Sequence, residues 1–145
     1  MTCSACERIE RIRLGTNPSF IAELRETYAV LHDHQPYRGW VVLLLKDHHE
    51  HFGQLSPDRQ ANIARDLGDA AAAIRSVTNC PRINYECLGN VLAHVHWHVI
   101  PRYLPPMDPD PKKAVWVQPE SFLNAPLEPS VRDELVDKLR SAWPD

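Results

Sequence analysis

The sequence predicts an α+β fold, with a mainly antiparallel sheet of about five strands, one long helix and a C-terminal helix. Two observations lead to this class. Short runs rich in β-branched and aromatic residues come first, and a long amphipathic helix then interrupts them before strand-like runs resume. Groups of strands that precede and follow a single helix along the sequence are typical of an α+β fold with a mainly antiparallel sheet.

The first three strands are expected before residue 46. Residues Phe20–Leu24 and Thr27–Leu31 form two short strand-like runs, joined near Arg25-Glu26. The next run, Trp40–Leu45, is apolar throughout and β-branched in part. A continuous apolar run of this length predicts a central strand.

A long helix is expected over about Pro57–Val77. Ser56 is a suitable N-cap, Pro57 fits the first helical position, and Asp58 adds an early acidic group. Apolar residues then recur at spacings of four, three, four and three, at Ile63, Leu67, Ala70, Ile74 and Val77.

Two more strands and a second helix are expected after the long helix. The strands are Arg82–Leu88 and His94–Ile100, separated by Gly89-Asn90. The segment Pro101–Pro129 contains eight prolines, so we expect it to be extended and wrapped on the surface. A last helix, over roughly Ser130–Trp143, would carry three apolar residues on one side: Val131, Leu135 and Leu139.

Length and composition are close to those of an ordinary soluble globular protein. The 145 residues suit a single domain over 1–145, which would bury about two thirds of its unfolded surface. A net charge of −3 and no basic stripe argue against nucleic-acid binding. The polar N-terminus and short apolar runs argue against a secretory signal and a membrane span. We therefore expect a cytoplasmic protein without nucleic-acid or membrane partners.

Two of the four cysteines form a C-x-x-C pair, Cys3 and Cys6. A domain of this size in a reducing compartment does not need disulfides, so the pair indicates metal binding or redox chemistry. Cys80 and Cys87 are expected to be partly buried apolar residues, and we assign them no role.

All eight histidines fall into two clusters, and the second has three at alternate positions: His94, His96 and His98. On a strand these side chains share one face, about 6.5 to 7 Å apart per step, while Val95, Trp97 and Val99 face the core. Three readings remain open at this point. The imidazoles could together bind one zinc ion, perform nucleophilic chemistry, or form a solvated polar face.

The stretch His94–Ile100 matches the motif His-φ-His-φ-His-φ-φ, where φ is apolar, and so resembles the histidine-triad (HIT) family. Nearby residues resemble the diadenosine tetraphosphate hydrolase-like branch: Asn84-Tyr85-Glu86, Gly89-Asn90 and Pro101-Arg102-Tyr103. The resemblance covers about residues 1–116. Residues 117–145 form a proline-rich tail and the C-terminal helix.

The resemblance implies an enzyme that cleaves phosphoanhydride or phosphoramidate bonds at the α-phosphate of a nucleotide, such as a diadenosine polyphosphate. His96 would be the nucleophile and form a nucleotidyl-histidine, and a backbone carbonyl would hold its other ring nitrogen. His98 would bind phosphate oxygens or assist the leaving group. Two alternatives stay open: a nucleotidyltransferase with the same intermediate, and a nucleotide-binding or protein-interaction module with incidental activity.

The same resemblance assigns substrate-binding roles to three further residues. Asn84 and Asn90 would surround the phosphate with donors. Asp33 would accept hydrogen bonds from the ribose hydroxyls; the alternative explanation of this residue is an ordinary turn aspartate before Pro36.

The resemblance also implies a structural zinc ion and a homodimer. A C-x-x-C pair in zinc-bearing HIT proteins is completed by a histidine after the central strand and by the first triad histidine. The ligands here would be Cys3, Cys6, His48 and His94, a closed tetrahedral set. His49 and His51 compete with His48 for the third place, and a mobile N-terminus with free thiols is the alternative.

Overall fold

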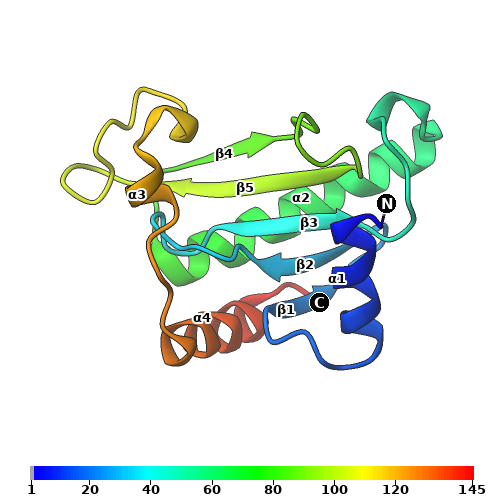
Figure 1. The fold of residues 1–145 in the computed structure, drawn as a ribbon, viewed down its shortest axis with the longest axis horizontal. Coiled ribbons are helices and arrows are strands. Elements are labelled where there is room, and N and C mark those ends of the chain that lie inside the picture. Colours follow the sequence, from blue (N-terminus) through cyan, green and yellow to red (C-terminus); the bar gives the residue numbers. More distant parts are fainter. Residues whose placement is uncertain (1) are drawn as a thin grey trace.

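The computed structural model describes residues 2–145, and its centre is one five-stranded sheet (Figure 1). The strand order is β1-β2-β3-β5-β4, and every neighbouring pair is antiparallel. The strands are β1 (Phe20–Glu23), β2 (Thr27–Leu31), β3 (Val41–Leu45), β4 (Arg82–Glu86) and β5 (His96–Arg102). The predicted α+β class with an antiparallel sheet of about five strands is confirmed.

The two long helices begin and end where their local chemistry requires. Helix α2 (Pro57–Thr78) starts after Ser56, whose Oγ accepts a hydrogen bond from the Arg59 backbone N–H, and ends at Asn79 in a left-handed conformation. Helix α4 (Pro129–Ala142) also has proline in its first turn. Its Leu135 and Leu139 are buried against the main core, as their spacing predicts.

Side chains on the two faces of the sheet enter different apolar clusters. Odd-numbered residues of β3, such as Val41 and Leu43, pack with α2 and α4 in the main core. Even-numbered residues of the same strand, Val42 and Leu44, pack under helix α1 (Ser4–Arg13). Because both faces of the central strand are covered, its continuous apolar run follows from its position. The face covered by α1 also carries His98 and His96, which lie opposite Val42 and Leu44 in the β3–β5 pairing.

Helix α1 is absent from the sequence-based prediction. Only Ala5 and Ile9 of its ten residues are buried, four positions apart, and they pack against the sheet. A helix this short is marginal in isolation, so packing on the sheet stabilises it. The sequence does show the matching spacing at Ala5, Ile9 and Ile12.

Strand β5 starts two residues later and ends two residues later than predicted. Before the strand, Val95 donates its N–H to the His49 carbonyl and accepts from the Leu45 N–H, so the chain here pairs irregularly with a loop. At the other end, Pro101 lies beyond Val99, the last residue paired with β3. Proline has no backbone N–H, but at Pro101 there is no β3 residue left to bond, so no hydrogen bond between β3 and β5 is lost. Strand β5 therefore continues beside β4.

The proline-rich segment contains more local structure than expected. It includes the 3₁₀ turn Val115–Val117 and the short helix α3 (Glu120–Leu123). Val115 is fully buried, and Asp108 is buried in an ion pair with Arg102 at 2.7 Å. These contacts tie the segment to the sheet, which corrects the prediction of a purely extended surface wrap.

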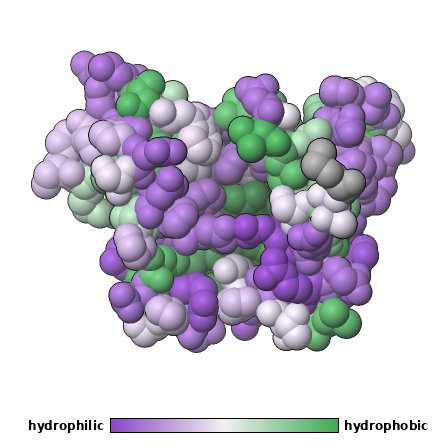
Figure 2. Space-filling view, viewed as in Figure 1, coloured by the Kyte–Doolittle hydropathy of each residue, from purple (hydrophilic) through white to green (hydrophobic). Residues whose placement is uncertain are grey.

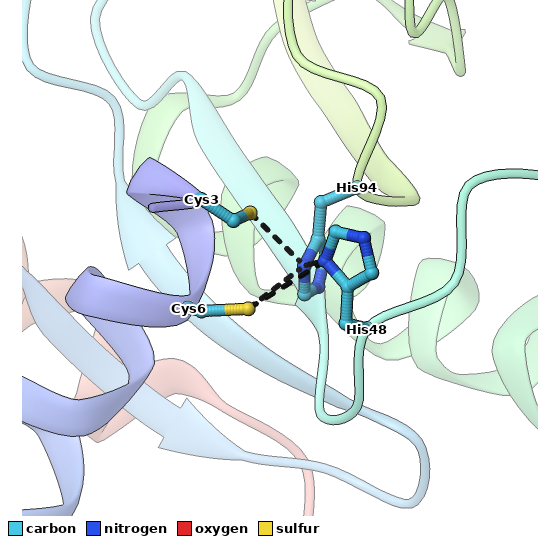
Figure 3. A group of neighbouring side chains, drawn as sticks. All are labelled: Cys3, Cys6, His48 and His94. Atoms are coloured by element: carbon cyan, nitrogen blue, oxygen red, sulfur yellow. Dashed lines mark hydrogen bonds between the residues drawn. The ribbon is translucent and has the colours of Figure 1, made fainter. Parts of the chain in front are cut away.

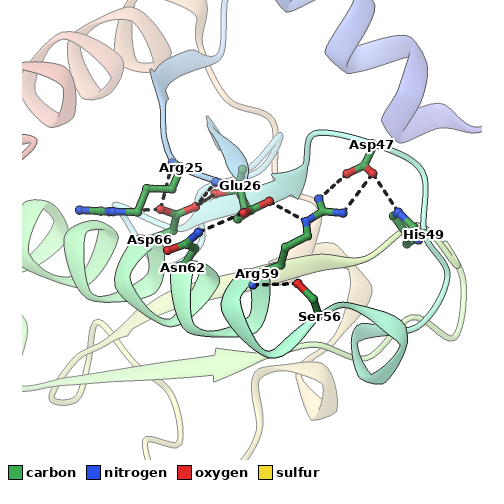
Figure 4. A network of polar contacts seen from close by, with 9 residues as sticks. Arg25, Glu26, Asp47, His49, Ser56, Arg59, Asn62 and Asp66 are labelled. Atoms are coloured by element: carbon green, nitrogen blue, oxygen red, sulfur yellow. Dashed lines mark hydrogen bonds and ion pairs between the residues drawn. The ribbon is translucent and has the colours of Figure 1, made fainter.

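The turn between β1 and β2 is held by a buried carboxylate on α2 (Figure 4). Asp66 is fully buried and accepts from the backbone N–H groups of Arg25 and Glu26 and from the Thr27 hydroxyl, at 2.9 to 3.1 Å. These bonds fix the first hairpin on the long helix.

Within residues 2–145, none of the helices combines the length and the apolar character needed to cross a membrane.

Candidate active site and metal cluster

The structure brings together the four side chains predicted to bind metal (Figure 3). Cys3 and Cys6 come from the start of α1, His48 from the loop after β3, and His94 from the residues just before β5. One ligand atom from each lies within 4.8 Å of all the others. The N-terminus thus meets two segments from the middle of the chain.

The separations inside this cluster fit a tetrahedral zinc ion. Bonds of about 2.3 Å to sulfur and about 2.0 to 2.1 Å to nitrogen place sulfur about 3.5 Å from nitrogen, and two nitrogens about 3.3 Å apart. The Nδ1 of His94 lies 3.5 Å from the Cys3 sulfur and 3.6 Å from the Cys6 sulfur. The two histidine Nδ1 atoms are 3.2 Å apart.

Hydrogen bonds leave the His94 ring suited to metal binding. Its Nε2 lies 2.7 Å from the Leu45 carbonyl oxygen, an acceptor, so Nε2 carries the proton and donates. Nδ1 therefore keeps its lone pair and faces the thiols. Burial lowers the pKa of His94, which keeps the ring neutral, and burial raises the pKa of the Cys6 thiol in the absence of a cation.

The loop that carries His48 is held by an ion-pair network (Figure 4). Arg59 of α2 bridges Glu26, at 2.8 Å, and Asp47, at 2.6 Å. Its hydrogen bonds lower the pKa of Asp47 to about 2. His49 pairs with the same Asp47 carboxylate at 2.8 Å, outside the cluster, and His51 is also absent from it. The geometry therefore favours His48 over both competitors.

His96 is placed with one ring nitrogen bonded and the other available. Its Nδ1 lies 2.7 Å from the carbonyl oxygen of His94, so Nδ1 donates a proton there. Nε2 then carries a lone pair. A backbone carbonyl was the partner expected from the sequence, and this contact matches it.

His98 has the opposite tautomer because of Trp40. The Trp40 indole N–H donates to Nδ1 of His98 at 3.1 Å, so the His98 proton lies on Nε2. Burial, with His32 and His96 nearby, lowers the pKa of His98 to about 3. The ring is therefore neutral at pH 7 and presents an N–H donor beside the lone pair of His96.

Three aromatic rings surround His98, and none of them was predicted as a site residue: His32, Trp40 and Trp116. The His32 ring stacks on Trp40 with centroids 4.0 Å apart, and Trp116 meets His98 edge-on at 5.3 Å. Trp116 also donates its indole N–H to Glu86. The WVVLLL run shows Trp40 as a core residue, but its partner lies 58 positions away, so local periodicity does not reveal the contact.

A hollow of ~170 Å³ opens between α1 and the histidine face of the sheet, and we call it the triad hollow. His96, His98, His32 and Asp33 supply polar groups, and α1 supplies Ser4 and Arg8. Apolar strand residues such as Val42 and Leu44 line it too. The space-filling view shows this face hollowed near its middle, with hydrophobic surface at the bottom (Figure 2). Apolar walls with a few polar groups are typical of ligand sites.

Asp33 sits at the edge of this hollow in a bidentate ion pair with Arg8. The two guanidinium–carboxylate distances are 2.9 and 2.5 Å. The Arg8 guanidinium holds the pKa of Asp33 below its ordinary value, so the group is a carboxylate at pH 7. Arg8 could not be predicted from the sequence, because the fold of α1 brings it to Asp33 from 25 positions away.

The two predicted phosphate-binding asparagines do not line the triad hollow. Asn84 accepts a hydrogen bond from Arg102 at 2.7 Å and lines a separate surface depression with Glu86 and Lys113. Asn90 is exposed in the loop between β4 and β5. The structure thus assembles His96, His98 and Asp33 but leaves Asn84 and Asn90 apart.

The chain that forms this histidine-lined hollow and Cys–His cluster also matches the profile of a known protein family. The family profile described as HIT domain matches residues 15–104, more than half of the chain. This chain belongs to the HIT domain family. The resemblance seen in the triad motif is confirmed.

Solved HIT proteins share the fold of this HIT domain at low identity. A HIT protein from Sinorhizobium meliloti is 22% identical with a TM-score of 0.75, covering 94% of this chain and 93% of that chain. A Zn-bound HIT protein from Mycobacterium smegmatis is 21% identical with a TM-score of 0.67, covering 98% and 93%. Plasmodium falciparum diadenosine triphosphate hydrolase is 13% identical with a TM-score of 0.65, covering 86% and 75%. Comparison with curated proteins gave no match.

Several residues of the two hollowed or clustered sites come from parts of the chain outside the matched residues 15–104. Helix α1 contributes Cys3, Cys6 and Arg8, and the segment after residue 104 contributes Trp116. The N-terminal residues thus complete the Cys–His cluster and one wall of the triad hollow, whereas Trp116 packs edge-on against His98.

Proposed function

We propose that this HIT domain is a nucleotide hydrolase that cleaves phosphoanhydride or phosphoramidate bonds at the α-phosphate, with diadenosine polyphosphates as the leading substrate class. Members of the family are nucleotide hydrolases or transferases, and one structural neighbour is a diadenosine triphosphate hydrolase. His96 would attack the α-phosphorus and release the remaining phosphate chain. Water would then cleave the phosphorus–nitrogen bond, which frees the nucleoside monophosphate and restores His96.

The hydrogen bond from His96 Nδ1 to the His94 carbonyl carries this proposal. It leaves Nε2 unprotonated, and a neutral imidazole with a free lone pair is the nucleophilic form. The carbonyl also stabilises positive charge that develops on the ring during attack. A solvated polar strand face would need no such arrangement.

His98 would serve as a neutral hydrogen-bond donor to the phosphate. Trp40 leaves its proton on Nε2, and burial keeps the ring uncharged. A preorganised donor beside the nucleophile stabilises charge that develops on the phosphoryl oxygens. Asp33, held by Arg8, would accept hydrogen bonds from the ribose hydroxyls at the edge of the triad hollow.

We further propose that Cys3, Cys6, His48 and His94 hold a structural zinc ion. The donor set and its separations fit tetrahedral coordination, and four protein ligands leave no open position for substrate. The ion would join α1 to the segment that leads into β5 and so fix the carbonyl that orients His96. A cytoplasmic homodimer remains the expected assembly and location.

Mass spectrometry of an acid-quenched reaction tests the covalent step. The parent protein, mixed with diadenosine tetraphosphate, is expected to carry an adenylyl group on His96. His96→Ala should form no adduct and lose at least about 10³-fold in turnover. The exposed His51, substituted in His51→Ala, provides the matched control and should react normally.

Three results would contradict parts of the proposal. Full turnover by His96→Ala would show that His96 is not the nucleophile. An adduct resolved only by added sugar phosphates would indicate a nucleotidyltransferase. Tight binding of AMP with no turnover on a broad panel of nucleotides would indicate a binding module instead.

A further inference from the structure

A second hollow adjoins the triad hollow, and we call it the arginine hollow. It has a volume of ~350 Å³ and lies between α1, the loop before β1 and the start of α4. Its lining residues include Arg8, Arg11, Ser19, Asp33 and Arg132. Arg8 and Asp33 line both hollows, so their ion pair forms the common wall.

The arginine hollow carries an excess of positive charge. Asp33 neutralises only Arg8. Arg11 is exposed, and among residues 2–145 no carboxylate lies within 4.0 Å of its guanidinium. Arg132 uses its Nε to bond the neighbouring Asp133 at 2.9 Å, which leaves its terminal amino groups without an ion-pair partner there. Two guanidinium groups therefore remain to bind an anion.

The position of this charge relative to the proposed site indicates which anion it would bind. A nucleotide with its α-phosphorus at His96 and its ribose hydroxyls at Asp33 directs those hydroxyls toward the common wall. A phosphate on the ribose 2′- or 3′-oxygen would then extend past Asp33 into the arginine hollow. Guanidinium groups bind phosphate oxygens through paired, charge-assisted hydrogen bonds.

The Arg8–Asp33 ion pair reduces the repulsion between the Asp33 carboxylate and a phosphate on the ribose. A lone carboxylate at the ribose would repel a phosphate on the adjacent oxygen. Arg8 offsets that charge through two hydrogen bonds, yet each Asp33 oxygen keeps a lone pair for the remaining ribose hydroxyl. Arg8, Arg11 and Arg132 all lie outside the residues matched to the family, so this charge belongs to the parts of the chain beyond the shared domain.

We infer that Arg11 and Arg132 form a subsite for a phosphate carried on the 2′- or 3′-oxygen of the nucleotide ribose. The inference rests on the proposed function, because it needs the ribose at Asp33. It narrows the substrate class to nucleotides that carry a ribose phosphate in addition to the 5′-phosphoanhydride or phosphoramidate.

Calorimetric titration with three ligands tests the subsite: AMP, adenosine 3′,5′-bisphosphate and adenosine 2′,5′-bisphosphate. At least one bisphosphate is expected to bind about 10-fold or more tightly than AMP, and the two identify which oxygen carries the phosphate. In Arg11→Gln/Arg132→Gln the preference should fall to within about 3-fold, with AMP binding retained. Arg13→Gln, on the same helix but outside the hollow, should keep the preference.

The failures of the two proposals can be told apart. Equal binding of AMP and both bisphosphates, or a preference that survives in the double variant, overturns the subsite but leaves the nucleotide hydrolase standing. Absence of binding for all three ligands, together with absence of an adduct on His96, overturns both.

Discussion

Trp40 donates its indole N–H to Nδ1 of His98 across 3.1 Å, and it thereby sets which nitrogen of that histidine carries a proton. Trp40 is fully buried, and the His32 ring stacks on its indole with centroids 4.0 Å apart. A core residue just before the central strand β3 therefore sets the proton position on a histidine that lines the triad hollow.

Replacement of this tryptophan should reduce catalysis more than its loss of volume explains. In Trp40→Phe the His98 proton can move to Nδ1, so we expect kcat/KM to fall by about 10-fold to 100-fold. Nitrogen NMR of His98 at pH 7 should show a mixture of tautomers. The matched control is Trp97→Phe, because the indole N–H of Trp97 has no partner among the described residues and faces the opposite side of the sheet. Equal loss in the two variants would contradict the role of Trp40.

The depressed pKa of His98 predicts a pH dependence of stability. The pKa lies at about 3 in the folded protein and at about 6.5 in the unfolded chain, so between these values only the unfolded chain binds the proton. Stability should therefore fall as the pH drops below about 6.5, by up to about 1.4 kcal/mol per unit for this group. Urea unfolding at pH 7.0, 6.0 and 5.0 should show a shallower loss for His98→Gln. A slope unchanged in this variant would contradict a neutral, half-buried His98.

The metal cluster predicts about one zinc ion per chain by elemental analysis. Cys3→Ala and His94→Ala should lose it, because three ligands hold the ion far more weakly than four. Chelation of the parent protein should lower the Tm by about 5 °C or more, since metal binding adds to folding stability. Cys87→Ala, a cysteine outside the cluster, should keep the metal. A metal-free parent protein with unchanged Tm would refute the site.

Asp33 predicts selectivity for ribose over sugars that lack hydroxyls. The parent protein should bind AMP about 10-fold more tightly than 2′,3′-dideoxy-AMP, because hydrogen bonds to a carboxylate contribute about 1.5 to 3 kcal/mol. In Asp33→Ala this ratio should approach one. Asp137→Ala serves as a comparison, since Asp137 is an exposed carboxylate outside the triad hollow. Equal affinity of the parent protein for AMP and 2′,3′-dideoxy-AMP would indicate that Asp33 is an ordinary turn residue and does not bind the ribose.

The buried Asp66 predicts a large effect on stability. In Asp66→Ala the backbone N–H groups of Arg25 and Glu26 and the Thr27 hydroxyl lose their acceptor, which should cost about 3 kcal/mol or more in unfolding free energy. Asp69 provides the control, because its carboxylate pairs with the partly exposed Arg25 side chain and with no other cation among residues 2–145. Asp69→Ala should cost below about 1 kcal/mol. Chemical denaturation measures both, and similar costs would show that Asp66 contributes no more than a surface ion pair.

Local patterns predicted much of the fold because they depend only on neighbouring residues. Thr27–Leu31 was predicted as a strand with the bounds that the structure gives to β2, and Pro57–Val77 differs from α2 by one residue at its end. Strand alternation and helix caps are properties of a few consecutive side chains. The C-x-x-C spacing and the triad motif likewise pointed to the residues that the structure gathers in the cluster and the hollow.

The sequence by itself determined the α+β class, the principal strands and helices, and the candidate residues His96, His98 and Cys3. Tertiary structure alone decided that α1 is helical, that Asn84 bonds Arg102 away from the hollow, and that Arg8 meets Asp33. It also decided the tautomers of the histidines, because their partners are distant in the chain or depend on the fold of a neighbouring loop. Periodicity is local, whereas a proton's position on a buried imidazole depends on whichever donor or acceptor packing brings within 3 Å.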